Sequence, residues 1–214
     1  MSHPDSAHTA TVDGRFLQAV VDGVVQSCGY FEERARTLLA ESGLDRQPVV
    51  GQDYAFDRFL DVLERIEETT GPNTLDRVGH RVAAELSWNH HVGNVDEALE
   101  TLDARHESMH SGDTGGYEFE RIDDTTGTLR STTPYPAAFE RGLVSGLGER
   151  FGHGSGYVNV RQESGPTVDG ASAKTFALAW WTDVEKRTET VIPAPTEAPS
   201  ASDNSARGRP AAGD

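Results

Sequence analysis

The first half of the chain, up to about residue 110, carries apolar residues at helical spacing. One apolar face runs from Phe16 to Val25, a second from Phe31 to Leu39, a third from Tyr54 to Ile66 and a fourth from Leu75 to Leu86. Asn94, with a glutamate three residues on, predicts the start of a fifth helix through VDEALETLDARHESMH. The pattern therefore predicts a helical N-terminal half.

The pattern changes from helical to alternating after the glycine-rich sequence SGDTGG. YEFERID and TLRSTTPYP predict two strands joined by a turn at DDTTG. A helix is expected from Ala137 to Phe151, and YVNVRQE and KTFALAWWTD predict two further strands. The expected fold class is α+β, with the helical half followed by a β-β-α-β-β antiparallel four-stranded sheet packed on helices.

The domain organisation follows from where apolar residues are absent. Residues 1–13 are polar and are expected to form a flexible N-terminus. Residues 14–184 are expected to form a single domain. Residues 185–214 are rich in Pro, Ala and Ser with almost nothing to bury, which predicts a disordered tail.

Net charge and composition narrow the function classes. The 214 residues carry a formal net charge of −16, which repels nucleic acid and anionic lipid, so neither is expected as a partner. An acidic chain in which lysine occurs only at positions 174 and 186 is typical of a salt-loving organism. The opening residues lack a basic start and an apolar run, so no signal peptide is expected, and no run approaches the roughly 20 apolar residues of a membrane-spanning helix. We therefore expect a cytoplasmic protein without membrane insertion.

Glycines and tryptophans in the second half point to close contacts. Gly142 and Gly146 are expected to form a narrow groove on their helix, where either another helix nests or a ligand approaches the backbone. Trp180 and Trp181 are adjacent on a predicted strand and must face opposite sides. One should enter the core, and the other needs a helix, a partner chain or a ligand to cover it. We expect a homodimer on this basis.

The sequence HESMH is a literal match to the H-E-x-x-H pattern of zinc hydrolases. His106 and His110 would bind zinc, and Glu107 would act as the base on a bound water. The segment lies at the end of a polar helix, where histidines also suit the negative end of the helix dipole. Cys28 is the only cysteine, which excludes a multi-cysteine zinc site within one chain.

Three segments carry a resemblance to a known superfamily. They are FLDVLERIEETTGPNTLDRVGHRVA, LETLDARHESMH and FERGLVSGLGERFG, followed by two closing strands. Over residues 14–182 they resemble the haem nitric-oxide-binding (HNOB) domains, the 4-vinyl reductase domains and the vesicle-tethering transport-particle subunits. The haem-binding branch is the most similar. The resemblance implies a small-molecule-sensing or regulatory domain, often dimeric and often part of signalling proteins.

The departures from these relatives concern the cofactor. The resemblance places His106 where the haem-binding relatives have their proximal histidine. Their Tyr-x-Ser-x-Arg signature, which grips the haem propionates, is absent, because that place reads LRSTTP. The cysteines common in the 4-vinyl reductase type are also absent. We therefore predict no bound cofactor, with haem through His106 left open.

The sequence as a whole predicts a non-catalytic sensory or regulatory protein of signal transduction. It would act through a pocket for a small apolar molecule, through an unidentified protein partner, or both. The alternatives are a scaffold that organises the cell by protein contacts alone, and a zinc hydrolase through HESMH. No catalytic residue is assigned. The residues expected to line a ligand pocket are His80, Trp88, His106, Tyr117, Tyr135, Phe139, Gly142, Gly146 and Trp180.

Overall fold

The computed structural model describes residues 10–28, 33, 37, 40–41, 48–88, 91–152, 158–163 and 173–180. Most of the predicted second helix and the whole predicted tail lie outside these residues. The helices are α1 (Gly14–Cys28), α3 (Phe56–Thr70), α4 (Pro72–Glu85), α5 (Val95–Glu100), α6 (Leu102–Glu107) and α7 (Ala137–Phe151). The strands are β1 (Thr11–Asp13), β2 (Asp53–Ala55), β3 (His110–Ser111), β4 (Tyr117–Arg121), β5 (Thr126–Ser131), β6 (Val158–Glu163) and β7 (Lys174–Trp180).

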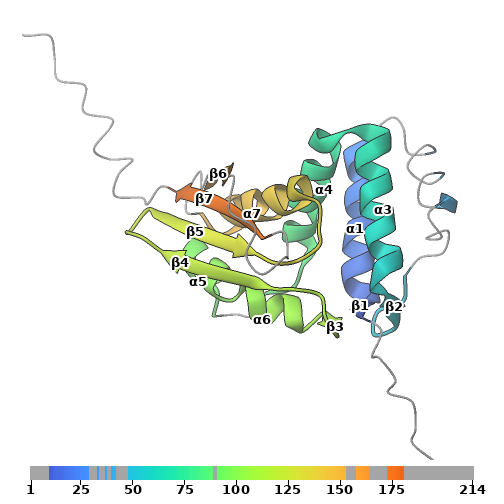
Figure 1. Ribbon diagram of the computed structural model, residues 1–214, viewed down its shortest axis with the longest axis horizontal. Helices are drawn as coiled ribbons and strands as arrows, with labels where there is room; N and C mark the ends of the chain where they lie inside the picture. Colours follow the sequence, from blue (N-terminus) through green and yellow to red (C-terminus); the bar gives the residue numbers. More distant parts are fainter. Residues whose placement is uncertain are drawn as a thin grey trace, which may run out of the picture.

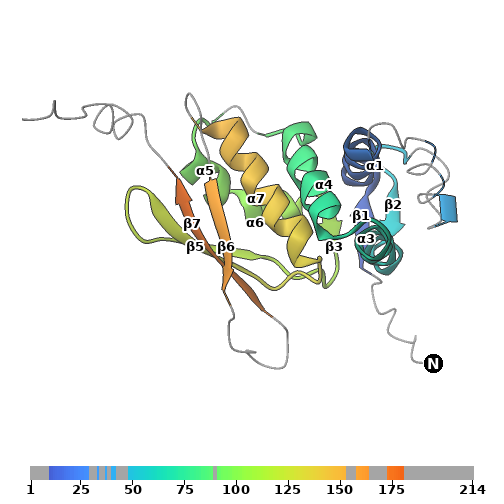
Figure 2. The ribbon, with the colours of Figure 1, turned by 90° about the horizontal axis from the view of Figure 1, so that it is seen from above.

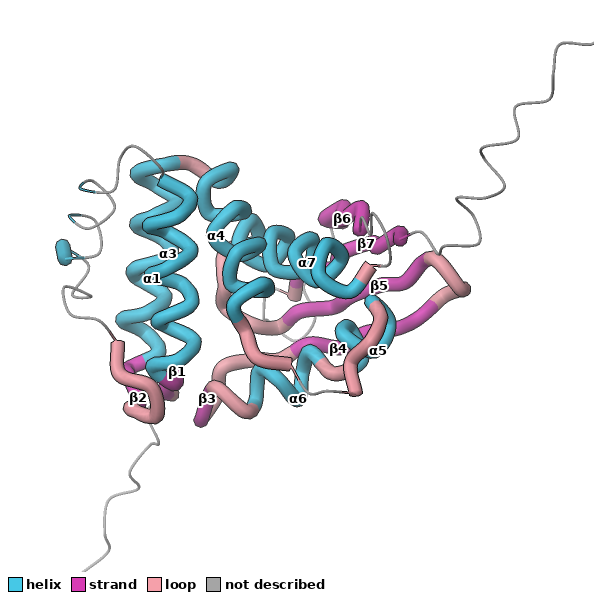
Figure 3. The backbone as a smooth tube through the Cα atoms, turned by 180° about the vertical axis from the view of Figure 1, so that it is seen from behind, coloured by secondary structure: helices cyan, strands magenta, loops and turns pink. Residues whose placement is uncertain are grey.

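The elements form layers, with a sheet at one side and two long helices at the other (Figure 1). Seen from above, α7 lies against the sheet, α4 lies beside α7, and α1 and α3 lie beyond α4 (Figure 2). The short helices α5 and α6 lie near β4, on the side seen in Figure 3. This arrangement confirms the α+β fold class predicted from the sequence.

The main sheet has the strand order β4-β5-β7-β6, and all its neighbouring strands are antiparallel. Phe176, Leu178 and Trp180 alternate along β7 and are buried, as their shared face predicts. Ala177 and Ala179, on the other face, are half-buried. Trp181 lies outside the described residues, so the partner expected to cover it stays a prediction.

A second, small sheet of order β2-β1-β3 was not predicted. Residues 11–13, expected to be flexible, form its central strand, and the side chain of Val12 is fully buried. Val12 pairs with Tyr54 on one side and with His110 on the other. The sheet therefore joins the starts of α1 and α3 to the segment that follows α6.

The predicted helix through VDEALETLDARHESMH is divided in the structure. Asn94 caps α5 as predicted, since its Oδ1 accepts a hydrogen bond from the Glu97 backbone N–H at 2.9 Å. Thr101 then separates α5 from α6, and its hydroxyl donates to the Glu97 carbonyl at 2.7 Å. His110 consequently lies on β3 rather than on a helix.

Helices α4 and α7 pack with their backbones in contact. A Cβ added at Gly142 would overlap the Asp76 carbonyl, and one added at Gly146 would crowd the His80 carbonyl. On the facing helix, a Cβ at Gly79 would overlap the Phe139 carbonyl. The glycine groove therefore holds α4, and the assignment of Gly142 and Gly146 to a ligand pocket is corrected. None of the described helices is both long enough and apolar enough to cross a membrane.

Candidate functional site

The two histidines of HESMH are buried together between the helical half and the main sheet. His106 lies in the last turn of α6 and His110 on β3, and their rings stack with centroids 4.0 Å apart. His106 Nε2 lies 3.2 Å from Thr114 Oγ1. His110 Nδ1 is 2.8 Å from the His106 carbonyl, and its Nε2 is 2.5 Å from the Tyr135 hydroxyl. We call His106, His110, Thr114 and Tyr135 the histidine cluster.

Burial decides the charge of both imidazoles. It lowers the pKa of His106 to about 4, because the charged form is excluded from water. It lowers the pKa of His110 to about 3, and the neighbouring His106 adds to the effect. Both rings are therefore neutral at pH 7. A neutral imidazole has one ring nitrogen free to accept, which suits either a hydroxyl donor or a metal ion.

Aromatic side chains enclose the histidine cluster. Phe16 from α1 lies edge-on to His110 and stacks with Tyr135, at centroid distances of 5.0 and 6.2 Å. Tyr117 from β4 lies edge-on to His106 at 5.5 Å. The cavity between these residues has a volume of about 10 Å³. The space beside His106 is therefore filled almost completely by side chains.

The structure brings four predicted pocket residues together and separates the others. His106, Tyr117, Tyr135 and Phe139 meet around the histidine cluster, with Phe139 5.4 Å from Tyr135. The others lie elsewhere: His80 pairs with Glu149 at 2.7 Å, Trp88 packs on Phe151, Trp180 packs near Phe119, and Gly142 and Gly146 contact α4.

The geometry of the histidines does not support the zinc-hydrolase alternative. Two histidines four apart on a helix could share one ion, but here the rings lie face to face and their nitrogens bond to different partners. Glu107 is exposed. Within the described residues, no group of three or more His, Cys, Asp or Glu side chains could hold a metal ion.

Sequence analysis missed a second buried polar group around Glu140. Its carboxylate, on the first turn of α7, is fully buried. It accepts hydrogen bonds from Ser131 Oγ and Thr133 Oγ1, at 2.5 and 2.6 Å, and its Oε2 lies 2.6 Å from Lys174 Nζ. We call Glu140, Ser131, Thr133 and Lys174 the carboxylate cluster. The only sequence feature that could have indicated this cluster is Lys174, an isolated lysine at the start of a predicted strand.

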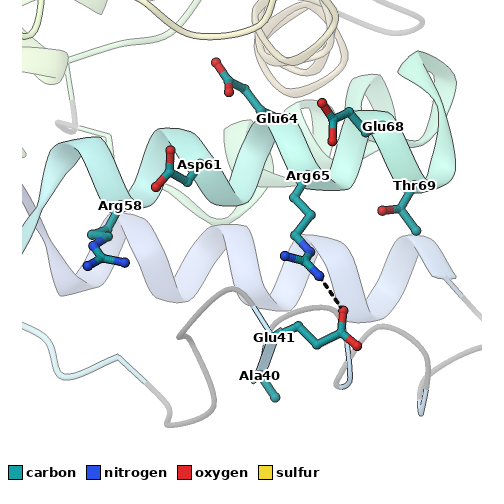
Figure 4. A pocket seen from close by; sticks show the side chains of 8 residues that line it. All are labelled: Ala40, Glu41, Arg58, Asp61, Glu64, Arg65, Glu68 and Thr69. Atoms are coloured by element: carbon teal, nitrogen blue, oxygen red, sulfur yellow. Dashed lines mark hydrogen bonds and ion pairs between the residues drawn. The ribbon is translucent and has the colours of Figure 1, made fainter.

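A larger hollow lies on the surface of α3, and its lining is charged. It has a volume of about 700 Å³ and is lined by Ala40, Glu41, Arg58, Asp61, Glu64, Arg65, Glu68 and Thr69 (Figure 4). Arg65 and Glu41 pair across it at 2.8 Å, and both are about half exposed. Its charged groups are solvated, so the buried clusters are the better site candidates.

The chain has the fold of H-NOX domains, which are haem-binding domains, and this confirms the resemblance seen in the sequence. Neither a protein-family model nor a curated protein sequence matches it. It is similar to a doubly substituted variant of the Tt H-NOX, with a TM-score of 0.62 and 14% identity over 78% of this chain and 94% of that one. It is also similar to an H-NOX protein from S. oneidensis in the Fe(II)NO state, with a TM-score of 0.60 and 14% identity over 79% and 99%. An oxygen-binding H-NOX domain related to soluble guanylate cyclases has a TM-score of 0.60 and 14% identity over 78% and 94%.

These similarities correct the prediction that no cofactor is bound. Two of the solved structures that share this fold concern haem, one of them within the H-NOX family, so haem is the cofactor to which the fold points. The donor in this chain is of the right kind, because His106 is buried and neutral. The cavity beside His106 is too small for a haem, since its volume of about 10 Å³ holds one water molecule and no macrocycle. In the described conformation, therefore, the residues do not fit a haem.

Proposed function

We propose that the chain is a non-catalytic sensory or regulatory domain of signal transduction. Its input is a small molecule received at the histidine cluster, and its output passes to a protein partner. The observation that carries the proposal is a buried, neutral histidine at the end of α6, within the fold of haem-binding domains. The same histidine is the one that the family resemblance assigns to haem.

Entry of a ligand requires the histidine cluster to open. Phe16 belongs to α1 and Tyr135 to the segment before α7, so their stacked rings close the site from two separate elements. Separating these two elements would free the His106 ring on the side of its cavity. Haem and smaller apolar molecules are the candidate inputs, because seven of the nine residues that line the cavity are aromatic or aliphatic, and the other two are Arg105 and His106.

The output is proposed to pass through protein contacts. The chain is expected to act as a homodimer and to engage a further protein. The half-buried face of β7 that carries Ala177 and Ala179 is the candidate surface for the dimer. The scaffolding alternative depends on residues 185–214, which lie outside the described residues.

Haemin titration followed by visible absorption tests this proposal. We expect the wild-type protein to develop a haem absorption band, and His106→Ala to lose it. His80→Ala is the matched control, because His80 is paired with Glu149 near the surface and should leave the band unchanged. Circular dichroism on each variant separates a lost ligand from a lost fold.

Two outcomes would contradict parts of this proposal. A folded wild-type protein that binds neither haemin nor a small apolar probe, and that captures no partner in pull-down assays, would contradict the sensory proposal. A haem band that survives in His106→Ala would contradict the assignment of this histidine and leave the function standing.

A further inference from the structure

The carboxylate of Glu140 is bound as a ligand would be, by three donor residues from two other segments of the chain. Ser131 ends β5, Thr133 follows it, and Lys174 begins β7. Two hydroxyls bond to Oε1, and the ammonium group faces Oε2. A carboxylate with a pair of hydroxyl donors and one cation has the partners that a buried anion needs.

These donors hold one another in place without Glu140. Ser131 and Lys174 face each other in the β5–β7 register. The Thr133 backbone N–H donates to Ser131 Oγ at 3.2 Å, and the two hydroxyl oxygens lie 3.2 Å apart. Lys174 Nζ donates to the Thr133 carbonyl at 2.9 Å and also to the Tyr135 carbonyl. The donor set is thus built by strand pairing and backbone contacts, whereas Glu140 reaches it through one side chain.

Two further observations indicate a binding site rather than a simple ion pair. Burial raises the pKa of the Tyr117 hydroxyl, and this hydroxyl lies within hydrogen-bonding reach of Glu140 and Thr133. The Lys174 side chain is 13% exposed while Glu140 is not exposed at all, so the lysine connects the cluster to the surface. The cluster therefore has a further hydroxyl beside it in the interior and an edge that reaches solvent.

We propose that Ser131, Thr133 and Lys174 form a carboxylate-binding site that the chain keeps filled with its own Glu140. A small monocarboxylate, of the size of formate, acetate or propionate, takes the same place when the Glu140 side chain is not there. This inference does not depend on the proposed function, since it uses neither histidine, although the two clusters are neighbours through Tyr135. A carboxylate ligand and Glu140 would use the same donors, so the two cannot be bound at the same time.

Chemical rescue of Glu140→Ala tests the proposal. The variant removes the resident carboxylate and leaves the donors and the space it filled. We expect sodium acetate or sodium formate to raise the thermal midpoint of this variant by several degrees over sodium chloride at equal ionic strength. The wild-type protein should show no such difference, because its site is filled.

Two matched variants define the specificity of the rescue. Glu149→Ala changes a glutamate on the same helix that is 73% exposed, and it should respond to acetate no more than to chloride. Glu140→Ala combined with Ser131→Ala should lose most of the response, because one of the hydroxyl donors is gone. If Glu140→Ala does not fold alone, refolding in acetate against refolding in chloride gives the same comparison.

The response of the variants to carboxylates decides whether the site exists. Folding or stabilisation of Glu140→Ala by carboxylates, absent in Glu149→Ala, supports the site. A Glu140→Ala protein that responds equally to acetate and chloride, or that neither anion restores, overturns it. An equal acetate response in Glu149→Ala also overturns it, because the effect would then be a general one of the salt.

Discussion

The histidine cluster and the carboxylate cluster are both buried polar groups of one domain, yet they differ in the charge that is buried. In the histidine cluster the titratable groups give up their charge, and neutral rings bond to hydroxyls and to a backbone carbonyl. In the carboxylate cluster Glu140 is held beside the cation of Lys174. Neutral groups can be surrounded by aromatic rings, whereas a charged pair needs its own donors.

The difference gives the two clusters opposite dependences on pH. The pKa values of His106 and His110 fall from 6.5 to about 4 and about 3, so their contribution to stability is complete above pH 6.5 and is lost as the pH falls from there. Burial raises the pKa of Glu140, although Lys174 opposes the change. The contribution of Glu140 is therefore complete below its ordinary value of 4.5 and is lost as the pH rises through the raised one.

Removing the cation of the carboxylate cluster should have the largest effect. Lys174→Met keeps much of the side-chain length but leaves a buried carboxyl without its cation, and we expect a loss of about 3 to 5 kcal/mol in unfolding free energy at pH 7. Urea unfolding measures it. Arg130→Met, which breaks the exposed pair with Glu118, should cost no more than about 1 kcal/mol. Similar losses in the two variants would remove the distinction between buried and exposed pairs.

Removing a hydroxyl of the histidine cluster should have an intermediate effect. Tyr135→Phe takes away the partner of His110 Nε2 and leaves a buried nitrogen unpaired, at a cost of roughly 1 to 3 kcal/mol. Tyr54→Phe is the control, because its hydroxyl accepts from the exposed Val49 N–H and water can replace it. A Tyr135→Phe protein as stable as the wild type would mean that this hydrogen bond is replaced or not formed in solution.

Per unit of pH, the change in unfolding free energy should be the smallest of these effects and the most specific. Between pH 6.5 and 4, each buried imidazole should lower the unfolding free energy by about 1.4 kcal/mol per pH unit as the pH falls. His110→Gln, which keeps a polar group but does not titrate, should remove about half of that slope. Glu140→Gln should steepen the net slope above pH 4.5, because it removes the opposing contribution. Parallel profiles in all three proteins would refute the assignment of these charges.

The sequence predicted the parts of the fold that depend on local patterns. Periodicity, together with proline, glycine and turn residues, placed the helix from Ala137 to Phe151 and the order of the four sheet strands along the chain, and Asn94 was recognised by its capping chemistry. The small sheet could not be predicted in this way. Its strands are two or three residues long and come from three distant segments, so no period can be measured in them.

The site was predicted only in part, for a related reason. His106 was identified because a family pattern marks its place, and Tyr135 and Phe139 were proposed with it. The carboxylate cluster joins Ser131, Glu140 and Lys174 across up to 43 positions, a spacing set by strand register and not by any motif. The volume beside His106 depends on how Phe16 packs from the far end of the chain, which spacing cannot reveal.

The contact of α4 with α7 has a mechanical consequence. Where side chains separate two helices, rotamer changes can absorb a small displacement. At Gly79, Gly142 and Gly146 the backbones of α4 and α7 are in direct contact, so no side chain can adjust to such a displacement. The helices α4 and α7 must therefore move together as a rigid body. Since Glu140 sits on the first turn of α7, and α4 also packs against α1, a shift that begins at the carboxylate is carried across the domain to the helix that bears Phe16.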